Sequence, residues 1–231
     1  MFVPGFMQRG GAWGPIADRV AGSHPTACLD LESDTLEGRV DEVTAGIPAG
    51  GVAIGYSMGG RLALHAALRD PDRPAAIVTV GASAGIEDPQ ERERRRAADE
   101  DLAGWIETHS IEAVVKRWEA QPVFATQDPA LVAAQRPARL EHSPPQLARV
   151  LRAAGQGATT PVWDRLGELR CPVLAVAGDR DDVYVNAARR LSELTPMGRL
   201  AIVPGVGHAV HLEAPEAFSE LLLDFLDEHL G

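Results

Sequence analysis

A serine stands between two glycines in the stretch GYSMG, residues 55–59. An apolar run, residues 51–56, precedes the serine, and an apolar helical pattern, residues 58–69, follows it. A tight strand-to-helix corner leaves little room for side chains, so it needs glycine on both sides. Such a corner points the Ser57 hydroxyl out of the sheet edge, near the positive end of a helix. The pattern predicts a reactive serine, and the alternative is a serine that only caps the helix.

A serine hydroxyl is a poor base or nucleophile until another group takes its proton. His208 lies in a glycine-flanked loop after the last apolar run, and can serve as that group. Three aspartates follow the preceding apolar run: Asp179, Asp181 and Asp182. The chain order Ser, Asp, His predicts that the histidine takes the proton and that one aspartate orients its ring. His211 is the alternative base, but it begins the entry into the last helix and lacks the glycine-lined loop.

A negative charge that develops in such a reaction needs backbone N–H donors beside the serine. The N–H of Met58, the next residue, is one candidate donor. The second candidate is the N–H of Phe6, in the loop VPGFMQRGG (residues 3–11) that follows the first apolar run. Together the two groups predict an oxyanion hole at the same edge as Ser57.

Short apolar runs alternate with helical patterns along most of the chain. The runs are continuous, as in parallel strands that are buried on both faces. We expect strands at residues 1–3, 26–31, 51–56, 75–81, 171–178 and 199–204. We expect helices at about residues 12–21, 34–46, 58–69, 184–195 and 214–230. This alternation predicts an α/β fold with a mostly parallel sheet of about six strands, flanked by helices.

Residues 86–168 interrupt the alternation, because charged helical segments separated by prolines take the place of strands. The segment follows the carboxyl end of an expected strand, where open α/β sheets bind their ligands. We therefore expect a single domain, residues 1–231, with a helical lid inserted at about residues 86–160.

The composition argues against several classes of partner and cofactor. The formal net charge is −11, which disfavours a nucleic-acid partner. No apolar run is long enough to span a bilayer, and the N-terminus MFVPGFMQRGG lacks the features of a signal peptide. Cys28 and Cys171 predict two free, core-like thiols in a reducing cytoplasm. We expect no metal, no organic cofactor and no membrane partner, and a monomer or small homo-oligomer.

With these residues in place, the chain resembles the α/β-hydrolase superfamily over essentially its whole length. Within it, the sequence is most similar to the family of 2-succinyl-6-hydroxy-2,4-cyclohexadiene-1-carboxylate synthases, the MenH-type enzymes of menaquinone biosynthesis. The resemblance rests on four stretches: GYSMGGRLAL (55–64), RERRRAADE (92–100), WEAQPVFA (118–125) and PGVGHAVHLEAPEAF (204–218). The middle two are the more specific, because lid sequences diverge among these enzymes.

The resemblance implies an α/β-hydrolase fold and a triad of Ser57, Asp181 and His208. It also implies four substrate-contacting side chains: Tyr56, Arg61, Arg95 and Trp118. The family's substrate carries several carboxylates, and arginines bind carboxylates through charge-assisted hydrogen bonds.

Residue type and spacing alone leave other interpretations of these side chains open. Arg61 could be on the exposed face of a helix, and Arg95 could belong to a solvated, salt-bridged face. Trp118 could be ordinary packing within the lid.

The implied activity is that of a lyase, in which a carboxylate-rich cyclohexene loses a proton and expels pyruvate. Ser57, activated by His208, would act as a base and form no acyl intermediate. One alternative is a general hydrolase (a carboxylesterase, thioesterase or carbon–carbon bond hydrolase) with Ser57 as covalent nucleophile. Another is a non-catalytic binding protein that keeps the pocket.

The chain departs from the family pattern in two places. Pro4-Gly5 stands where the family has His-Gly in its oxyanion loop, and a proline would hold the preceding residue extended. The first expected strand begins at Met1, so we expect a sheet without the family's N-terminal edge strands.

Overall fold

Five strands form one sheet in the computed structural model, which describes residues 1–230. Their bounds are β1 (Phe2–Val3), β2 (Gly51–Tyr56), β3 (Pro74–Val80), β4 (Val173–Gly178) and β5 (Gly198–Val203). The strands lie side by side in the order β1-β2-β3-β4-β5, and every neighbouring pair is parallel. All carboxyl ends therefore lie at one edge, so that loops following different strands can meet there.

The strand expected at residues 26–31 is wrong. This segment makes a single bridge, in which Cys28 pairs with Phe2. It runs beside β1, but β1 has only two residues and Pro4 follows it closely. No longer ladder can form on so short a partner, so the sheet has five strands where about six were expected.

Both cysteines carry free thiols. Cys171 is buried just before β4, and this burial raises the pKa of its thiol to about 11. Cys28 is exposed, so the expected core-like position is wrong for this residue. The cause is local, because the segment that carries Cys28 leaves the sheet after its one bridge.

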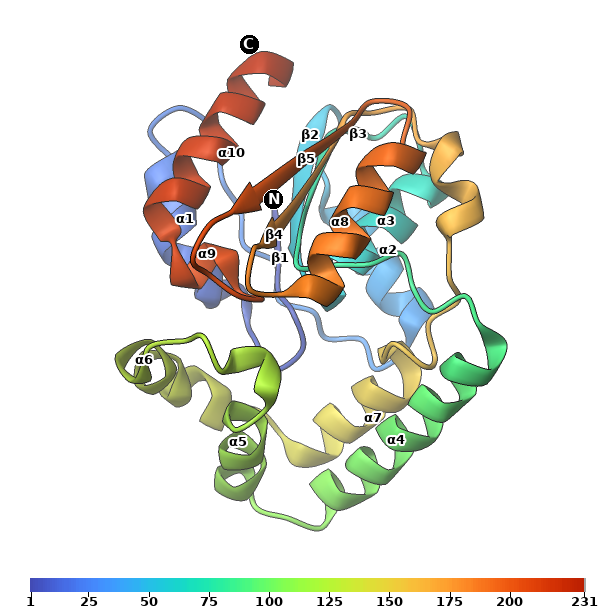
Figure 1. Ribbon diagram of the computed structural model, residues 1–231, viewed down its shortest axis with the longest axis vertical. Helices are drawn as coiled ribbons and strands as arrows, with labels where there is room; N and C mark the ends of the chain where they lie inside the picture. The colour runs from blue at the N-terminus through green and yellow to red at the C-terminus, as the bar shows by residue number, and fades with distance from the viewer. Residues whose placement is uncertain (231) are drawn as a thin grey trace.

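Two groups of helices cover the two faces of the sheet (Figure 1). One group consists of α2 (Leu36–Gly46), α3 (Met58–Arg69) and α8 (Asp182–Leu194). The other consists of α1 (Gly14–Val20), which follows the 3₁₀ turn η1 (Gly10–Trp13), α9 (Val210–Glu213) and α10 (Pro215–Leu230). Successive strand side chains point to opposite faces, so Ile77 packs with the first group and Val78 with the second. Each face thus has its own apolar core.

The chain leaves the sheet between β3 and β4 and forms four helices. They are α4 (Pro89–Glu107), α5 (Ile111–Glu119), α6 (Pro129–Leu140) and α7 (Pro144–Ala154), with 3₁₀ turns η2 (Pro122–Phe124) and η3 (Trp163–Glu168). Figure 1 shows the four helices together beyond one end of the sheet, coloured green to yellow. Helices α4, α5 and α7 share an apolar cluster that includes Val115 and Leu147. Met7, from the loop after β1, also enters this cluster and so joins these three helices to the sheet layer.

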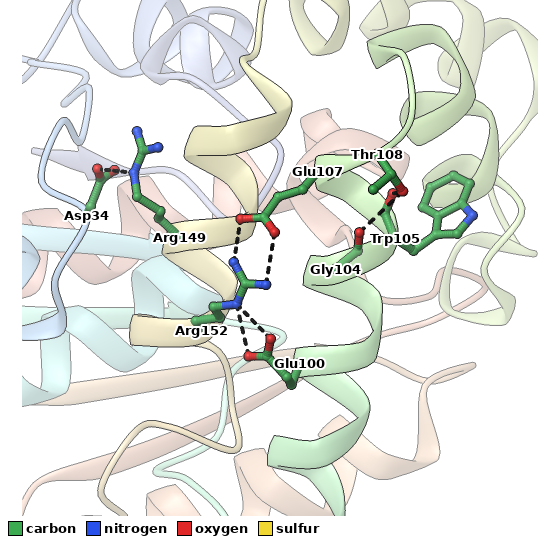
Figure 2. A network of polar contacts seen from close by, with 8 residues as sticks. All are labelled: Asp34, Glu100, Gly104, Trp105, Glu107, Thr108, Arg149 and Arg152. Atoms are coloured by element: carbon green, nitrogen blue, oxygen red, sulfur yellow. Dashed lines mark hydrogen bonds and ion pairs between the residues drawn. The ribbon is translucent and has the colours of Figure 1, made fainter.

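Ion pairs hold α4 and α7 together along their exposed sides (Figure 2). The Arg152 guanidinium of α7 donates to both carboxylate oxygens of Glu100, at 2.9 and 3.0 Å, and to both of Glu107, at 2.5 and 3.1 Å. Arg149 of α7 donates to Asp34, in the loop before α2, at 2.6 Å. Each exposed pair contributes little stability by itself. Together they fix α4 relative to α7 and fasten α7 to the sheet layer.

The corner between β2 and α3 presents Ser57 at the carboxyl edge of the sheet. Ser57 has φ 51° and ψ −110°, a left-handed conformation that is rare for a residue with a side chain. A Cβ atom on Gly55 would lie 2.4 Å from the carbonyl carbon and oxygen of Gly59. The start of α3 therefore packs on β2 with no room for a side chain. The Ser57 side chain makes no capping hydrogen bond, so it does not act as a helix cap.

His211, the alternative base, lies in the apolar core on the α1 and α10 side. Its ring stacks on Trp13, with centroids 4.1 Å apart, and lies 4.6 Å from the ring of Tyr56. Neither ring nitrogen has a hydrogen-bond partner among residues 1–230. Burial lowers the pKa of His211 to about 3, with a smaller contribution from the nearby His208. This ring is therefore neutral and packs like an aromatic side chain.

We predict that Gly55→Ala lowers the free energy of unfolding by about 3 kcal/mol, because the new methyl group meets the backbone of Gly59. Gly104→Ala is the matched control, since Gly104 lies inside α4 and a Cβ there meets nothing within 4 Å. This control should stabilise the protein by about 0.5–1 kcal/mol, the usual gain in a helix interior. Urea unfolding of both variants checks the pair, and equal effects would contradict the close approach.

We predict that His211→Phe reduces the loss of stability in acid. A histidine whose folded pKa is depressed binds a proton only in the unfolded chain, so stability falls as the pH drops below about 6.5. Since the pKa of His211 in the folded protein is about 3, this residue should lower the free energy of unfolding by about 2 kcal/mol between pH 7.5 and pH 5. Urea unfolding at both pH values should show a loss about 2 kcal/mol smaller in His211→Phe than in the wild type. His65, whose pKa burial also lowers, to about 4, keeps its own contribution in both proteins. An equal loss in the two proteins would contradict the neutral, buried state of His211.

Candidate active site

Three side chains from three loops form a hydrogen-bonded line. Ser57 lies at the end of β2, Asp181 follows β4 and His208 follows β5. His208 Nδ1 lies 2.8 Å from Asp181 Oδ2, and His208 Nε2 lies 3.2 Å from Ser57 Oγ. An ionised carboxylate only accepts, so Nδ1–H donates to Asp181 and leaves Nε2 free to accept the Ser57 hydroxyl. The line can therefore remove a proton from the serine.

The other two aspartates of the sequence GDRDD have different roles. Asp179 accepts the Gly205 N–H at 2.7 Å and so braces the loop after β5. Asp182 is the first residue of α8 and makes no hydrogen bond with the His208 ring. Asp181 caps α8 by accepting the Tyr184 N–H at 3.4 Å, besides binding the imidazole. All three aspartates follow β4, so their place in the sequence alone does not show which one binds the histidine.

A cavity of about 540 Å³ opens beside this line. Its wall contains every site residue expected from the sequence: Phe6, Tyr56, Ser57, Met58, Arg61, Arg95, Trp118, Asp181 and His208. The sheet layer, with β2, α3 and the loops after the strands, supplies most of these residues, whereas α4 supplies Arg95 and α5 supplies Trp118. The cavity thus lies between the sheet edge and the four helices of residues 89–154.

Two backbone N–H groups at the cavity are free of protein acceptors. The N–H groups of Phe6 and Met58 donate to no protein group among the described residues. The loop that holds Phe6 is closed by Gln8, whose N–H donates to the Gly5 carbonyl at 3.2 Å and whose Oε1 accepts the Gly5 N–H at 3.3 Å. These contacts hold the turn that follows Pro4.

Arg61 is buried on α3, with 4% of its surface exposed, so the interpretation as a solvated helix residue does not apply. Its guanidinium donates to the Ala154 carbonyl at 3.2 Å, at the end of α7. Burial lowers the pKa of Arg61 from its ordinary value. No carboxylate lies within ion-pair distance of it among residues 1–230. A buried cation without an anionic partner favours an anionic ligand.

Arg95 reaches the cavity from α4. It donates to Asp99 at 2.8 Å and to the amide oxygen of Gln156 at 2.9 Å. The Asp99 carboxylate is buried and also accepts the Gly157 N–H at 3.2 Å. Arg95 is therefore held in place by α4 itself and by the chain after α7. Its third guanidinium nitrogen donates to no protein group within residues 1–230.

Aromatic rings form much of the remaining wall. Trp118 lies edge-on to Phe6, with ring centroids 5.2 Å apart, which brings α5 against the loop after β1. Tyr56 lies beneath His208, with centroids 5.2 Å apart. Burial raises the pKa of Tyr56 well above its ordinary value, so its phenol is neutral. These rings make part of the cavity wall beside the serine apolar.

Two further wall residues carry no recognisable sequence pattern. The ring of Tyr184 on α8 lies 4.4 Å from that of His208, and its hydroxyl accepts a hydrogen bond from the Gln156 amide at 2.6 Å. Gln156 therefore links Arg95 to Tyr184 across the mouth of the cavity. A single tyrosine or glutamine has no diagnostic spacing, so only the folded chain identifies them.

The structure also bears on metals and membranes. Across residues 1–230, no group of three or more His, Cys, Asp or Glu side chains is arranged to hold a metal ion. No helix in the same range combines the length and apolar character that a membrane crossing needs.

Known proteins share this architecture. MenH from S. aureus has a solved structure that matches with a TM-score of 0.91, covering 100% of this chain and 93% of that one, at 24% identity. An esterase from Thermogutta terrifontis matches with a TM-score of 0.79 and 21% identity, over 99% of this chain and 89% of that one. At these identities the matches support the fold, and they confirm the expected α/β-hydrolase architecture.

A Bacillus subtilis (strain 168) protein with the provisional name 2-succinyl-6-hydroxy-2,4-cyclohexadiene-1-carboxylate synthase is 35% identical over 176 residues, which are 75% of this chain. The chain covers 64% of that protein's length. A Yersinia pestis (strain Pestoides F) protein named as the same synthase is 26% identical, over 99% of this chain and 87% of that protein. The alpha/beta hydrolase family model matches residues 1–221. The chain belongs to the alpha/beta hydrolase family.

Proposed function

We propose that the protein is a 2-succinyl-6-hydroxy-2,4-cyclohexadiene-1-carboxylate synthase, a lyase that eliminates pyruvate from a carboxylate-rich cyclohexene in menaquinone biosynthesis. The observation that carries this proposal is that Arg61 and Arg95, from two different layers, line the same cavity as Ser57. Two cations around one serine suit a substrate with several carboxylates better than a neutral ester. The names of the Bacillus and Yersinia relatives support the same assignment.

The proposed reaction uses Ser57, His208 and Asp181 as a catalytic triad. His208 Nε2 takes the Ser57 hydroxyl proton, and Asp181 stabilises the resulting imidazolium. The serine oxygen then removes a proton from a substrate carbon beside a carbonyl. The electron pair of that C–H bond passes through an enolate and breaks the C–O bond to the pyruvyl group. The departing pyruvate takes up a proton from His208, so the triad is restored and no water is consumed.

The N–H groups of Phe6 and Met58 are the proposed oxyanion hole for that enolate. Both line the cavity and both lack a protein acceptor among residues 1–230. One such donor is typically worth about 2.7–4 kcal/mol of barrier. Tyr56 and Trp118 are proposed to hold the apolar ring of the substrate. The helices α4 to α7, within the expected insertion at about residues 86–160, are proposed as the lid of a single cytoplasmic domain.

An ordinary hydrolase is the second candidate, because it would use the same machinery. The strained Ser57 backbone, with φ 51°, is the geometry of a covalent nucleophile as well as of a base. In that case Ser57 would attack a carbonyl carbon and form an acyl-enzyme, which water would then hydrolyse. The two functions differ in the need for the arginines and for water. The third candidate is a binding protein that keeps the pocket but does not catalyse a reaction. The reactivity of Ser57 toward a fluorophosphonate tests this candidate.

We predict that the protein releases pyruvate from the cyclohexene precursor of the synthase reaction much faster than it cleaves a p-nitrophenyl ester. Ser57→Ala and His208→Ala should each abolish most of this turnover, because either change removes the base. Pyruvate release is followed in a coupled assay, beside release of p-nitrophenol. Strong ester cleavage with a trapped acyl-enzyme and no pyruvate would assign the hydrolase instead.

We predict that Arg61→Met and Arg95→Gln each lower kcat/KM for pyruvate release about 10–100-fold, the cost of losing a charge-assisted hydrogen bond. Cleavage of a neutral ester should change much less. Arg94→Gln is the matched control, since Arg94 is an exposed neighbour on α4 that does not line the cavity. Equal losses on the two substrates would contradict carboxylate binding by these arginines.

A further inference from the structure

Besides Asp179, a second carboxylate holds the loop that carries His208, namely that of Glu213 at the end of α9. Glu213 Oε2 accepts the Gly207 N–H at 2.8 Å, and Oε1 accepts the Ala209 N–H at 3.0 Å. Gly207 and Ala209 are the residues immediately before and after His208. The carboxylate therefore binds the backbone on both sides of the histidine. Glu213 reaches back over the single turn of α9 to the N–H of Ala209, the residue that precedes this helix.

The same carboxylate also binds the helical insertion. The Thr126 hydroxyl, between η2 and α6, donates to Glu213 Oε2 at 2.7 Å. Among residues 1–230, the carboxylate has no cation within ion-pair distance. Its charge is satisfied by three neutral donors, of which the insertion supplies one. Charge-assisted bonds of this kind are stronger than neutral ones.

Thr126 also touches the histidine loop directly. A Cβ atom added to Gly207 would lie 2.2 Å from Thr126 Oγ1, so Gly207 leaves the space that the threonine fills. Both residues line the active-site cavity beside His208. The segment between η2 and α6 therefore packs on the backbone that sets the imidazole, with no side chain in between.

We propose that Glu213 is a positioning residue that couples the placement of the insertion at Thr126 to the orientation of His208. With Thr126 seated, the carboxylate has its third donor and the loop is fixed from both sides. Without Thr126, the loop keeps its two hydrogen bonds to Glu213 but loses the packing of Thr126 on Gly207. His208 Nε2 is then less well oriented toward Ser57. This inference rests on the proposed role of His208 as the base for Ser57. It holds whether Ser57 acts as a base or as a nucleophile.

A fluorophosphonate probe tests the coupling, because its reaction needs an activated serine and no native substrate. Ser57 Oγ attacks phosphorus, fluoride leaves, and His208 accepts the serine proton. We expect Glu213→Gln to slow the maximal labelling rate about 10–100-fold, since its amide adds a donor where the loop needs acceptors. Thr126→Val should slow it about 5–10-fold, and Thr126→Ser, which keeps the hydroxyl, should recover most of that loss. The concentration of probe for half-maximal labelling should stay within about threefold.

Two matched controls separate positioning from general damage. Glu216→Gln makes the same charge change at an exposed residue of α10, and Thr108→Val removes a hydroxyl at the end of α4, remote from the loop. Both should label like the wild type. Hydrogen exchange at Gly207 and Ala209 should accelerate in Thr126→Val and not in Thr108→Val.

Labelling of Glu213→Gln and Thr126→Val within about twofold of the wild type would overturn the coupling. An effect on half-maximal concentration alone would also overturn it, because it would indicate altered cavity shape. Should Glu213→Gln fail to fold, Thr126→Val and Thr126→Ser decide the question. A wild type that is labelled but releases no pyruvate would refute the proposed synthase and leave this test intact.

Discussion

The hydrogen bond between His208 Nδ1 and Asp181 is the interaction on which the candidate site depends. Because the carboxylate only accepts, this 2.8 Å contact places the ring proton on Nδ1 and leaves Nε2 as the acceptor for Ser57. The three residues come from loops after β2, β4 and β5, and only a parallel sheet brings those loops to one edge. By bringing these loops together, the fold determines which nitrogen of the His208 ring carries the proton. Asp181 accepts the hydrogen bond from that nitrogen while it also caps α8.

The cavity places positive charge where the chain as a whole is acidic. Arg61 and Arg95 line a site in a protein of formal net charge −11. The guanidinium of Arg61 is buried, and among residues 1–230 its one hydrogen-bond acceptor is a backbone carbonyl, so its burial carries a desolvation cost. Arg95 avoids much of that cost because 42% of its side-chain surface is exposed. Its guanidinium is oriented by Asp99, which in turn accepts the Gly157 N–H. The two arginines thus differ, because the first is buried against a backbone carbonyl and the second is exposed and oriented by a carboxylate.

The helices of residues 89–154 complete the site, because the sheet edge alone supplies neither Arg95 nor Trp118. Their attachment is distributed over several points. Met7 joins their apolar cluster, Arg149 reaches Asp34, and Thr126 binds Glu213 beside the histidine. Of these three contacts, only the last lies next to the backbone that carries His208. Exposed ion pairs of Arg152 join α7 to α4. They keep α4, and with it Arg95, at a fixed position relative to α7.

Local patterns in the sequence determined much of this arrangement. The helix expected at residues 58–69 and the strand expected at 51–56 match α3 and β2, because periodicity and the glycine-flanked corner act within a few residues. Ser57 and His208 could be chosen for the same reason, since each lies in a distinctive loop after an apolar run. The strand expected at 26–31 failed because pairing depends on the length of a partner that lies elsewhere in the chain.

Only the tertiary structure decided the rest. Three aspartates share one stretch, and the contact with a histidine 27 residues away selects Asp181. Arg61 has the sequence context of an exposed helix residue, yet packing against the end of α7 buries it. Glu213 and Thr126 are 87 residues apart, and neither stands in a pattern that announces their contact. Hydrophobic periodicity reports the environment of a residue along its own element, whereas hydrogen bonds between distant segments arise only when the elements pack.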